Sequence, residues 1–325
     1  MEFQVSVPGK VILHGEHSVV YGKAAVAAAI NLRTEVRVEQ STLVVLDLKD
    51  FGQRFSWSLA EFNALGTLAL GEAEITQPSE EILAALRATF ELQSESKCHG
   101  SLLTFLFLYT AIAHKKNNGC YIPAELVVSS SLPIGAGLGS SAAYSVALCA
   151  ALLRLFKAVP TSEGSPSEET LSLISQWAFQ SEVILHGKPS GIDNSICTHG
   201  GALLFQKGAI QEINTSMPAY RILLVNTRVS RNTRALVALV RGRLERHPQV
   251  TTAIFEALDE TAKQSWRILR DACQKPSAAG IGHPGSCSNN NNNTSNSNSN
   301  STHNRTPISR TDQQLCDAAG VRNSR

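Results

Sequence analysis

The sequence lacks three features that mark specialised classes of protein: a strong excess of one charge, a long apolar run and paired cysteines. Lysine and arginine number 29 against 27 acidic residues, and a net charge of +2 favours neither nucleic acid nor a membrane as a partner. The longest apolar run, residues 102–113, is too short to span a bilayer and predicts a buried helix. Seven cysteines without a CxxC pair are typical of reduced thiols rather than of disulfides or a zinc site.

The remaining composition is that of a globular protein. A length of 325 residues and a hydrophobic content of 43% predict about two packed domains. The first residues show no charged start followed by an apolar core, so we expect no secretory signal and a cytoplasmic location. From residue 275 onward the chain is rich in Asn, Ser, Gly and Pro, which cannot bury a core, and we expect a disordered tail over 275–325.

The apolar patterns predict a mixture of strands and helices. Alternating residues Thr34, Val36 and Val38, followed by the run 43–48, predict a β-hairpin or a pair of strands. Helices are expected over much of 59–115 and over 142–156, 233–247 and 251–273, and further strands over 125–129, 201–205 and 221–227.

The most informative stretch is PIGAGLGSSAAYS at 133–145, which joins a predicted strand to a predicted helix. Its glycines, Gly135, Gly137 and Gly139, let the backbone approach an anion closely. The helix that follows presents free N–H groups to that anion. The loop lacks both the lysine of a Walker motif and the third glycine of a dinucleotide fingerprint, because Ser140 and Ser141 stand there. It predicts either a phosphate cradle or a tight turn with a serine cap.

A second segment predicts a helix with a carboxylate on its apolar stripe. Ser167 followed by two glutamates is a helix start, and Gly187 followed by a proline is a helix stop. Glu182 shares the stripe of Ile174 and Ala178. We expect Glu182 to face inward beside a cation or hydrogen-bond donors, unless the stripe is offset and the side chain reaches water.

Two further segments carry concentrated polar chemistry. Residues 8–22, PGKVILHGEHSVVYG, hold Lys10, Glu16 and two histidines among turn glycines. The histidines lack a third ligand at zinc spacing, and Lys10 alone could be a surface lysine. Asp193 follows a Pro and a Gly in HGKPSGIDNS at 186–195, where an aspartate alone most often caps its own turn. Together, a phosphate cradle, a lysine and two carboxylates are the parts of phosphoryl transfer, with Glu182 and Ser141 as oxygen ligands for Mg²⁺.

These segments resemble the motifs of the GHMP small-molecule kinases, and among them those of the mevalonate kinase family. The resemblance rests on residues 8–22, 133–145, WAFQSEVILHGKPSGID at 177–193 and NTRVSRNTRALV at 226–237, and it covers about 3–273. It implies an α+β fold of two domains: residues 1–215 form the domain that binds ATP and substrate, and 216–274 form part of a smaller, incomplete C-terminal domain. It also implies a cytosolic homodimer that phosphorylates the C5 hydroxyl of mevalonate.

The resemblance also implies roles for individual residues. Asp193 would be the base that deprotonates the hydroxyl, with Lys10 beside it and beside the γ-phosphate, and Ser141 and Glu182 would hold Mg²⁺. The residues implied in binding the ATP phosphates are Lys10, Ser130, Gly135, Ala136, Gly137, Leu138, Gly139, Ser140 and Ser141. Glu16, His17 and Thr233 would lie close to mevalonate.

The sequence departs from the family pattern at its C-terminus. The third GHMP motif, a glycine-rich loop that completes the phosphate site, has no counterpart here. We therefore keep two alternatives beside an active mevalonate kinase: an impaired, truncated form that binds ATP or a partner chain, and a related kinase that acts on a sugar or on phosphomevalonate.

Overall fold

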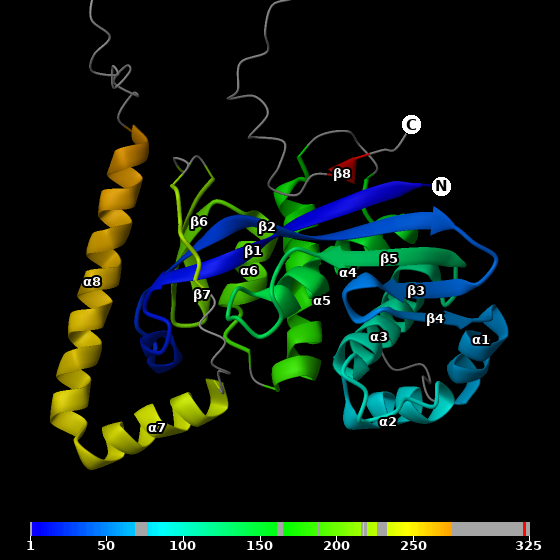
Figure 1. The fold of residues 1–325 in the computed structure, drawn as a ribbon, viewed down its shortest axis with the longest axis horizontal. Helices are drawn as coiled ribbons and strands as arrows, with labels where there is room; N and C mark the ends of the chain where they lie inside the picture. The colour runs from blue at the N-terminus through cyan, green and yellow to red at the C-terminus, as the bar shows by residue number, and fades with distance from the viewer. Residues whose placement is uncertain are drawn as a thin grey trace, which may run out of the picture.

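The fold is a mixed sheet with helices packed against it, and the α+β class predicted from the sequence is confirmed (Figure 1). The structure is a computed structural model, and it describes residues 2–68, 77–160, 165–187, 189–215, 217, 220–225, 233–274 and 321–322. Within these residues no helix is both long enough and apolar enough to cross a membrane.

Eight strands of the described chain form one sheet in the order β4-β3-β5-β2-β1-β8, with β6 paired to β2 and β7 paired to β6. Their bounds are β1 (Phe3–His14), β2 (Ala25–Gln40), β3 (Val44–Leu48), β4 (Gln53–Trp57), β5 (Ala124–Ser130), β6 (Ala202–Gln206), β7 (Ala209–Asn214) and β8 (Val321–Arg322). The long strand β2 pairs with β1 along one edge. Its other edge pairs with β6 near its start and with β5 near its end.

The predicted strands at 34–38 and 43–48 exist, but they do not pair as a hairpin. Strand β5 lies between them, antiparallel to β2 and parallel to β3. Residues 41–43 connect β2 to β3 across this gap. The gap is about 10 Å, two inter-strand spacings, which three extended residues can reach. The apolar strand β5 fills it and buries Leu126 and Val128.

The helices follow their sequence signals closely, with one exception. They are α1 (Leu59–Leu68), α2 (Glu80–Thr89), α3 (His99–Asn117), α4 (Ser140–Leu155), α5 (Glu168–His186), α6 (Ile192–His199), α7 (Thr233–Arg246) and α8 (Pro248–Gln274), with short 3₁₀ turns η1 (Ser18–Tyr21) and η2 (Lys49–Phe51). The exception is α6, which was not predicted: Asp193, expected in a loop after the helix of Glu182, lies in the first turn of α6. The apolar run 102–113 lies in α3 and is buried throughout, as predicted. Ser167 caps α5 by accepting the Thr170 N–H at 3.3 Å, and Gly187 ends the helix.

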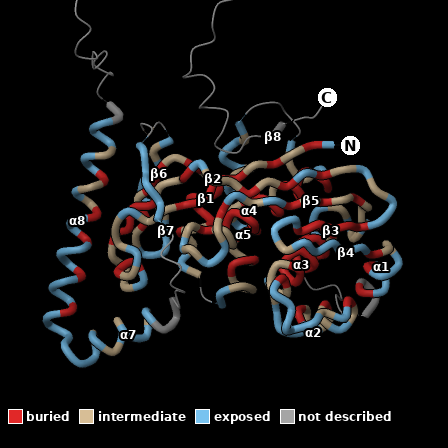
Figure 2. The backbone as a smooth tube through the Cα atoms, in the orientation of Figure 1, coloured by how far each residue is buried: buried red, intermediate tan, exposed pale blue. Residues whose placement is uncertain are grey.

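The main core lies between the sheet and helices α3 and α4. Alternate residues of β1 point into it, Phe3, Val5 and Val7, each no more than 2% exposed. Figure 2 shows this region as buried, while α7 and the outer side of α8 are exposed. This core holds the strand ends, and therefore the loops that leave them, in fixed positions.

The start of β2 is covered on both faces. Ala25 and Ala27 pack against Ile192 and Ile196 of α6. Ala24 and Val26 pack with Ala262 and Trp266 of α8 on the other side. Because successive side chains of a strand point to opposite faces, a run of small residues allows a helix to approach from each side. The same strand thus positions α6 and α8.

Two sequence predictions, the strand at 221–227 and the tail at 275–325, fall partly outside the described residues. Residues 221–225 form no strand, and all five are exposed; 226–227 are not described. A strand needs a hydrogen-bonding neighbour, and among the described residues nothing pairs with 221–225, so the prediction is wrong there. The predicted tail is described only at β8, which pairs with β1 at Gln4 and Val5.

Candidate active site

Lys10 and Asp193 form an ion pair between the middle of β1 and the first turn of α6. The Lys10 Nζ and Asp193 Oδ1 atoms lie 3.1 Å apart. The Lys10 side chain is 7% exposed and the Asp193 side chain 34%, so the lysine is buried while the aspartate is partly open to solvent. The alternative of a surface lysine is therefore wrong.

The glycine loop lies directly against β1 at this pair. The Lys10 N–H donates to the Leu138 carbonyl at 2.9 Å. A Cβ atom on Gly139 would lie 2.6 Å from Lys10 Cγ, and one on Gly9 would lie 2.4 Å from a Leu132 methyl carbon. Both contacts are closer than side chains allow, so two glycines are required for the loop to pack on the strand. The loop, Lys10 and Asp193 therefore meet in space.

The loop has the backbone that its glycines predict. Gly135, Gly137 and Gly139 have φ of 73°, 78° and 72°, in the left-handed region that favours glycine. Gly139 is the N-cap of α4 and no side chain caps the helix, so the serine-cap alternative is wrong. The first N–H groups of a helix have no partner within it, and together with the helix dipole they form a site for an anion.

Glu182 of α5 faces inward beside hydrogen-bond donors. It is 3% exposed, which excludes the alternative of a side chain reaching water. Ser145 Oγ donates to Glu182 Oε1 at 3.5 Å, and His186 Nε2 lies 3.5 Å from Oε2. The same His186 nitrogen lies 3.1 Å from Ser141 Oγ. The hydroxyl and carboxylate predicted as metal ligands are thus neighbours.

The pKa of Glu182 is raised to about 7, first by burial and then by the negative charge of Asp193. Hydrogen bonds from Ser141 and Ser145 and the charge of Lys10 act in the opposite direction. A buried carboxylate with a raised pKa gains most from a bound cation, because the cation removes the penalty for ionisation.

The oxygens of Ser141 and Glu182 fit Mg²⁺ bound to a phosphate. Mg²⁺ prefers one or two hard protein oxygens and takes its other ligands from phosphate and water. Among the described residues no group of three or more His, Cys, Asp and Glu could hold a metal ion. A cavity of about 220 Å³ lies elsewhere, between β1, α4 and α5, and is lined mainly by apolar side chains.

The other predicted site residues lie at the end of β5, in the segment after β1 and at the start of α7. Ser130 Oγ lies 2.8 Å from Thr34 Oγ1 and accepts the Leu132 N–H at 3.2 Å, so it fixes the end of β5. Glu16 is exposed in the turn after β1, and His17 is half-buried at the start of η1. Thr233 begins α7, and its side chain lies outside the described residues.

Sequence reasoning missed Gly9, Ser145, His186 and Cys197. Ser145 and His186 each lie four residues after a predicted metal ligand, and side chains at i and i+4 share a helix face, so the spacing could have indicated both. Cys197 lies four residues after Asp193; burial first, and then the Asp193 charge, raises the pKa of its thiol. Gly9 gave no signal, because its role depends on the packing of a distant loop.

The sequence is similar to known kinases. Residues 105–201 match the family model described as GHMP kinases N terminal domain. The chain is 42% identical over 284 residues to mevalonate kinase from Homo sapiens, covering 84% of this chain and 71% of the relative. It is 40% identical over 287 residues to mevalonate kinase from Arabidopsis thaliana, covering 83% and 74% of the two chains.

Solved structures share the fold. The Methanococcus jannaschii mevalonate kinase aligns with a TM-score of 0.57 at 19% identity, over 82% of this chain and 73% of that one. The L. major mevalonate kinase in complex with R-mevalonate aligns with a TM-score of 0.54 at 19% identity, over 83% and 69%. The predicted GHMP kinase fold is thereby confirmed for the matched part of the chain.

The raised pKa of Glu182 predicts a pH-dependent stability of the metal-free protein. The folded-state pKa of about 7 exceeds the ordinary 4.5, so stability from this group is complete below pH 4.5 and is lost as the pH rises through 7. At about 1.4 kcal/mol per pH unit between the two values, the loss is roughly 3 kcal/mol. Urea unfolding should show Glu182→Gln gaining about this much on the wild type between pH 4.5 and 8.

Glu169→Gln, an exposed position on the same helix, is the control and should track the wild type at every pH. Equal pH profiles for Glu182→Gln and the wild type would contradict the inward, desolvated placement of Glu182.

Proposed function

The chain belongs to the mevalonate kinase family of enzymes within the GHMP kinases, and from this premise we propose that it transfers the γ-phosphoryl group of ATP to the C5 hydroxyl of mevalonate, giving 5-phosphomevalonate and ADP. The observation that carries the proposal is the Lys10–Asp193 ion pair, which lies against the glycine loop. Phosphoryl transfer depends on positioning and charge, and this arrangement supplies both.

Asp193 is the proposed base. Its carboxylate lies at the start of α6, where it pairs with the Lys10 ammonium at 3.1 Å. Its side chain is 34% exposed, so a substrate hydroxyl can approach it from solvent. As the hydroxyl attacks phosphorus, its proton passes to a carboxylate oxygen of Asp193.

Lys10 serves both partners of the reaction. Because it is buried, its charge is weakly screened by water and acts on the groups around it. Its ammonium stabilises ionised Asp193 before transfer, and it lies next to the loop that would hold the γ-phosphate. A lysine here offsets the negative charge that accumulates when carboxylate and phosphate approach each other.

The loop 133–139 and the first turn of α4 would bind the ATP phosphates through backbone N–H groups. Ser141 and Glu182 would hold Mg²⁺, which when bound neutralises phosphate charge. Ser145 and His186 keep these two oxygen ligands oriented through the contacts described above.

The substrate assignment follows the relatives. Relatives at 40–42% identity are mevalonate kinases, and the aligned L. major enzyme binds R-mevalonate. Glu16, His17 and Thr233 are proposed as residues close to mevalonate. We also propose that the protein is a homodimer located in the cytoplasm. A monomeric mass in sedimentation would contradict the dimer, and recovery from another cell fraction would contradict the location.

Purified 325-residue protein should release ADP from ATP when mevalonate and Mg²⁺ are both present, and EDTA should stop the release. A panel with galactose and phosphomevalonate separates the related-kinase alternative. Measurable ATP binding without product over hours would contradict the proposal and favour the impaired form. A normal rate would eliminate that alternative.

Replacing Asp193 by Asn or Ala should lower kcat at least 100-fold, because the attacking hydroxyl loses its proton acceptor. The affinity for ATP, measured by calorimetry, should change no more than about twofold to threefold, since the loop contacts remain. Asp271→Asn, at an exposed position on α8, is the matched control and should retain the wild-type rate. An Asp193 variant that keeps most of its rate would refute the base assignment.

A further inference from the structure

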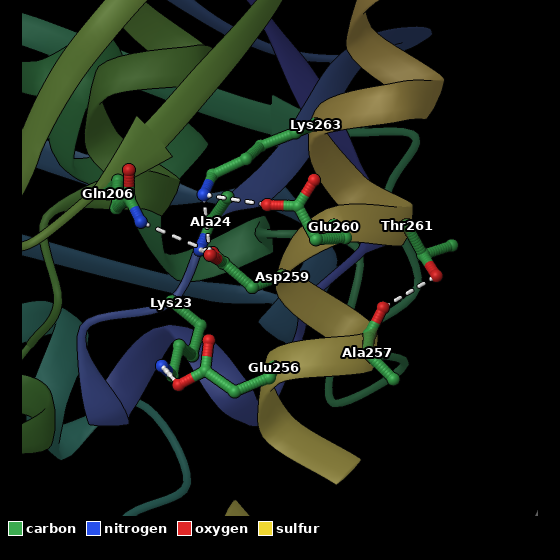
Figure 3. Close-up of polar contacts among 9 residues, drawn as sticks. All are labelled: Lys23, Ala24, Gln206, Glu256, Ala257, Asp259, Glu260, Thr261 and Lys263. Atoms are coloured by element: carbon green, nitrogen blue, oxygen red, sulfur yellow. Dashed lines mark hydrogen bonds and ion pairs between the residues drawn. The ribbon is translucent and has the colours of Figure 1, made fainter. Parts of the chain in front are cut away.

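Helix α8 contacts the segment Gly15–Ala24, which joins β1 to β2 and carries Glu16 and His17. The rings of Tyr21 and Phe255 stack with centroids 4.6 Å apart. One residue further along α8, Glu256 pairs with Lys23, and one turn beyond it Asp259 points at the backbone of Ala24 (Figure 3). Three successive contacts therefore hold this segment from a helix that lies more than 230 residues away in the sequence.

Asp259 is the buried charged residue of this set. It is 5% exposed, and its Oδ1 atom accepts the Ala24 N–H at 2.6 Å and a Gln206 side-chain N–H at 3.2 Å. Its Oδ2 atom accepts from Lys263 Nζ at 2.6 Å. Burial alone would raise the pKa of Asp259, but the Lys263 hydrogen bond and the Ala24 N–H outweigh it and lower the pKa below its usual value. The carboxylate is therefore ionised, and both of its oxygens have partners.

The segment 15–24 also has internal backbone hydrogen bonds. The Val19 N–H donates to the Gly15 carbonyl at 3.0 Å, and the Lys23 N–H donates to the Ser18 carbonyl at 3.3 Å. Gly15 has φ of 84°, and a Cβ atom there would lie 2.2 Å from the Ala24 carbonyl oxygen. Ala24 thus lies between Gly15 on one side and Asp259 on the other, so a shift of Ala24 toward Gly15 would displace Gly15 as well.

We propose that Asp259 is a positioning residue: by holding Ala24 it fixes the segment 15–24, and with it Glu16 and His17, against the alcohol substrate. The claim about the substrate rests on the proposed function, whereas the hold on the segment does not. Within the described chain the hydrogen bonds of Asp259 go to Ala24 just before β2, to β6 and to α8, and none goes to the glycine loop. Asp259 therefore acts on the alcohol side of the site and leaves the ATP side unchanged.

The test combines kinetics with hydrogen exchange on Asp259→Ala, with Glu260→Gln as the matched control. Glu260 is the neighbouring acid, it contacts the same Lys263 at 3.3 Å, and its side chain is 66% exposed. For Asp259→Ala we expect the KM for mevalonate to rise about tenfold, because Glu16 and His17 lose the fixed position proposed for substrate binding, and a loss of uniform binding raises KM without changing kcat. The kcat and the KM for ATP should stay within about twofold. Amide exchange in the peptide covering 15–24 should quicken about tenfold or more.

The conservative variant separates positioning from bulk stability. Asp259→Asn keeps a carbonyl oxygen for the Ala24 N–H, so it should restore most of the wild-type KM for mevalonate. Glu260→Gln should match the wild type in kinetics and exchange. If Asp259→Ala does not fold, Lys263→Met takes its place: it releases the carboxylate from its cation and should raise the KM for mevalonate severalfold with faster exchange at 15–24.

Equal losses in kcat and in both KM values, or unchanged exchange at 15–24 in a folded variant, would overturn the proposal. Failure of the proposed function gives a different result: the wild type would show no mevalonate-dependent ADP release, while the exchange experiment would still decide whether Asp259 holds the segment.

Discussion

The buried ammonium of Lys10 is the constraint on which the rest of the site depends. A charge removed from water needs a partner, and Asp193 supplies it at 3.1 Å. That partner must come from α6, which lies on the sheet only because the start of β2 has small side chains. The glycine loop must pass beside the same lysine, which is possible only without a side chain at 9 and 139. One buried charge therefore fixes a strand, a helix and a loop relative to one another.

The two carboxylates near this lysine, Asp193 and Glu182, have different surroundings. The difference matches their different proposed roles, proton acceptor and metal ligand. Asp193 is partly open to solvent at a helix start, where a substrate hydroxyl can approach it. Glu182 is closed off, with a pKa raised to about 7 first by burial and then by Asp193. The proposed base is thus partly open and the proposed metal ligand is desolvated, and both lie near one loop, as the proposed reaction of a metal-bound phosphate with an alcohol requires.

Much of this arrangement was predictable from the sequence because it depends on local rules. The capped helix 168–186, the inward Glu182, the strand-loop-helix at 124–155 and the buried run 102–113 all follow from spacing, capping and glycine content. The errors concern pairing between distant segments. No local signal in residues 34–48 indicates that β5 lies between two strands that are consecutive in the sequence. No local signal near Gly9 indicates the loop that packs against it. The Asp259 contact was invisible for the same reason, since its partner is a backbone N–H of Ala24.

The central claim is that the oxygen attacking phosphorus meets Asp193 at the glycine loop. A crystal structure with mevalonate and a non-hydrolysable ATP analogue tests this most directly. We expect the C5 oxygen at about 2.6–3.2 Å from an Asp193 carboxylate oxygen, with the γ-phosphate over residues 135–141 and in line for attack. A mevalonate molecule whose C5 oxygen lies well beyond hydrogen-bond reach of Asp193, in a complex with the phosphates in place, would contradict it.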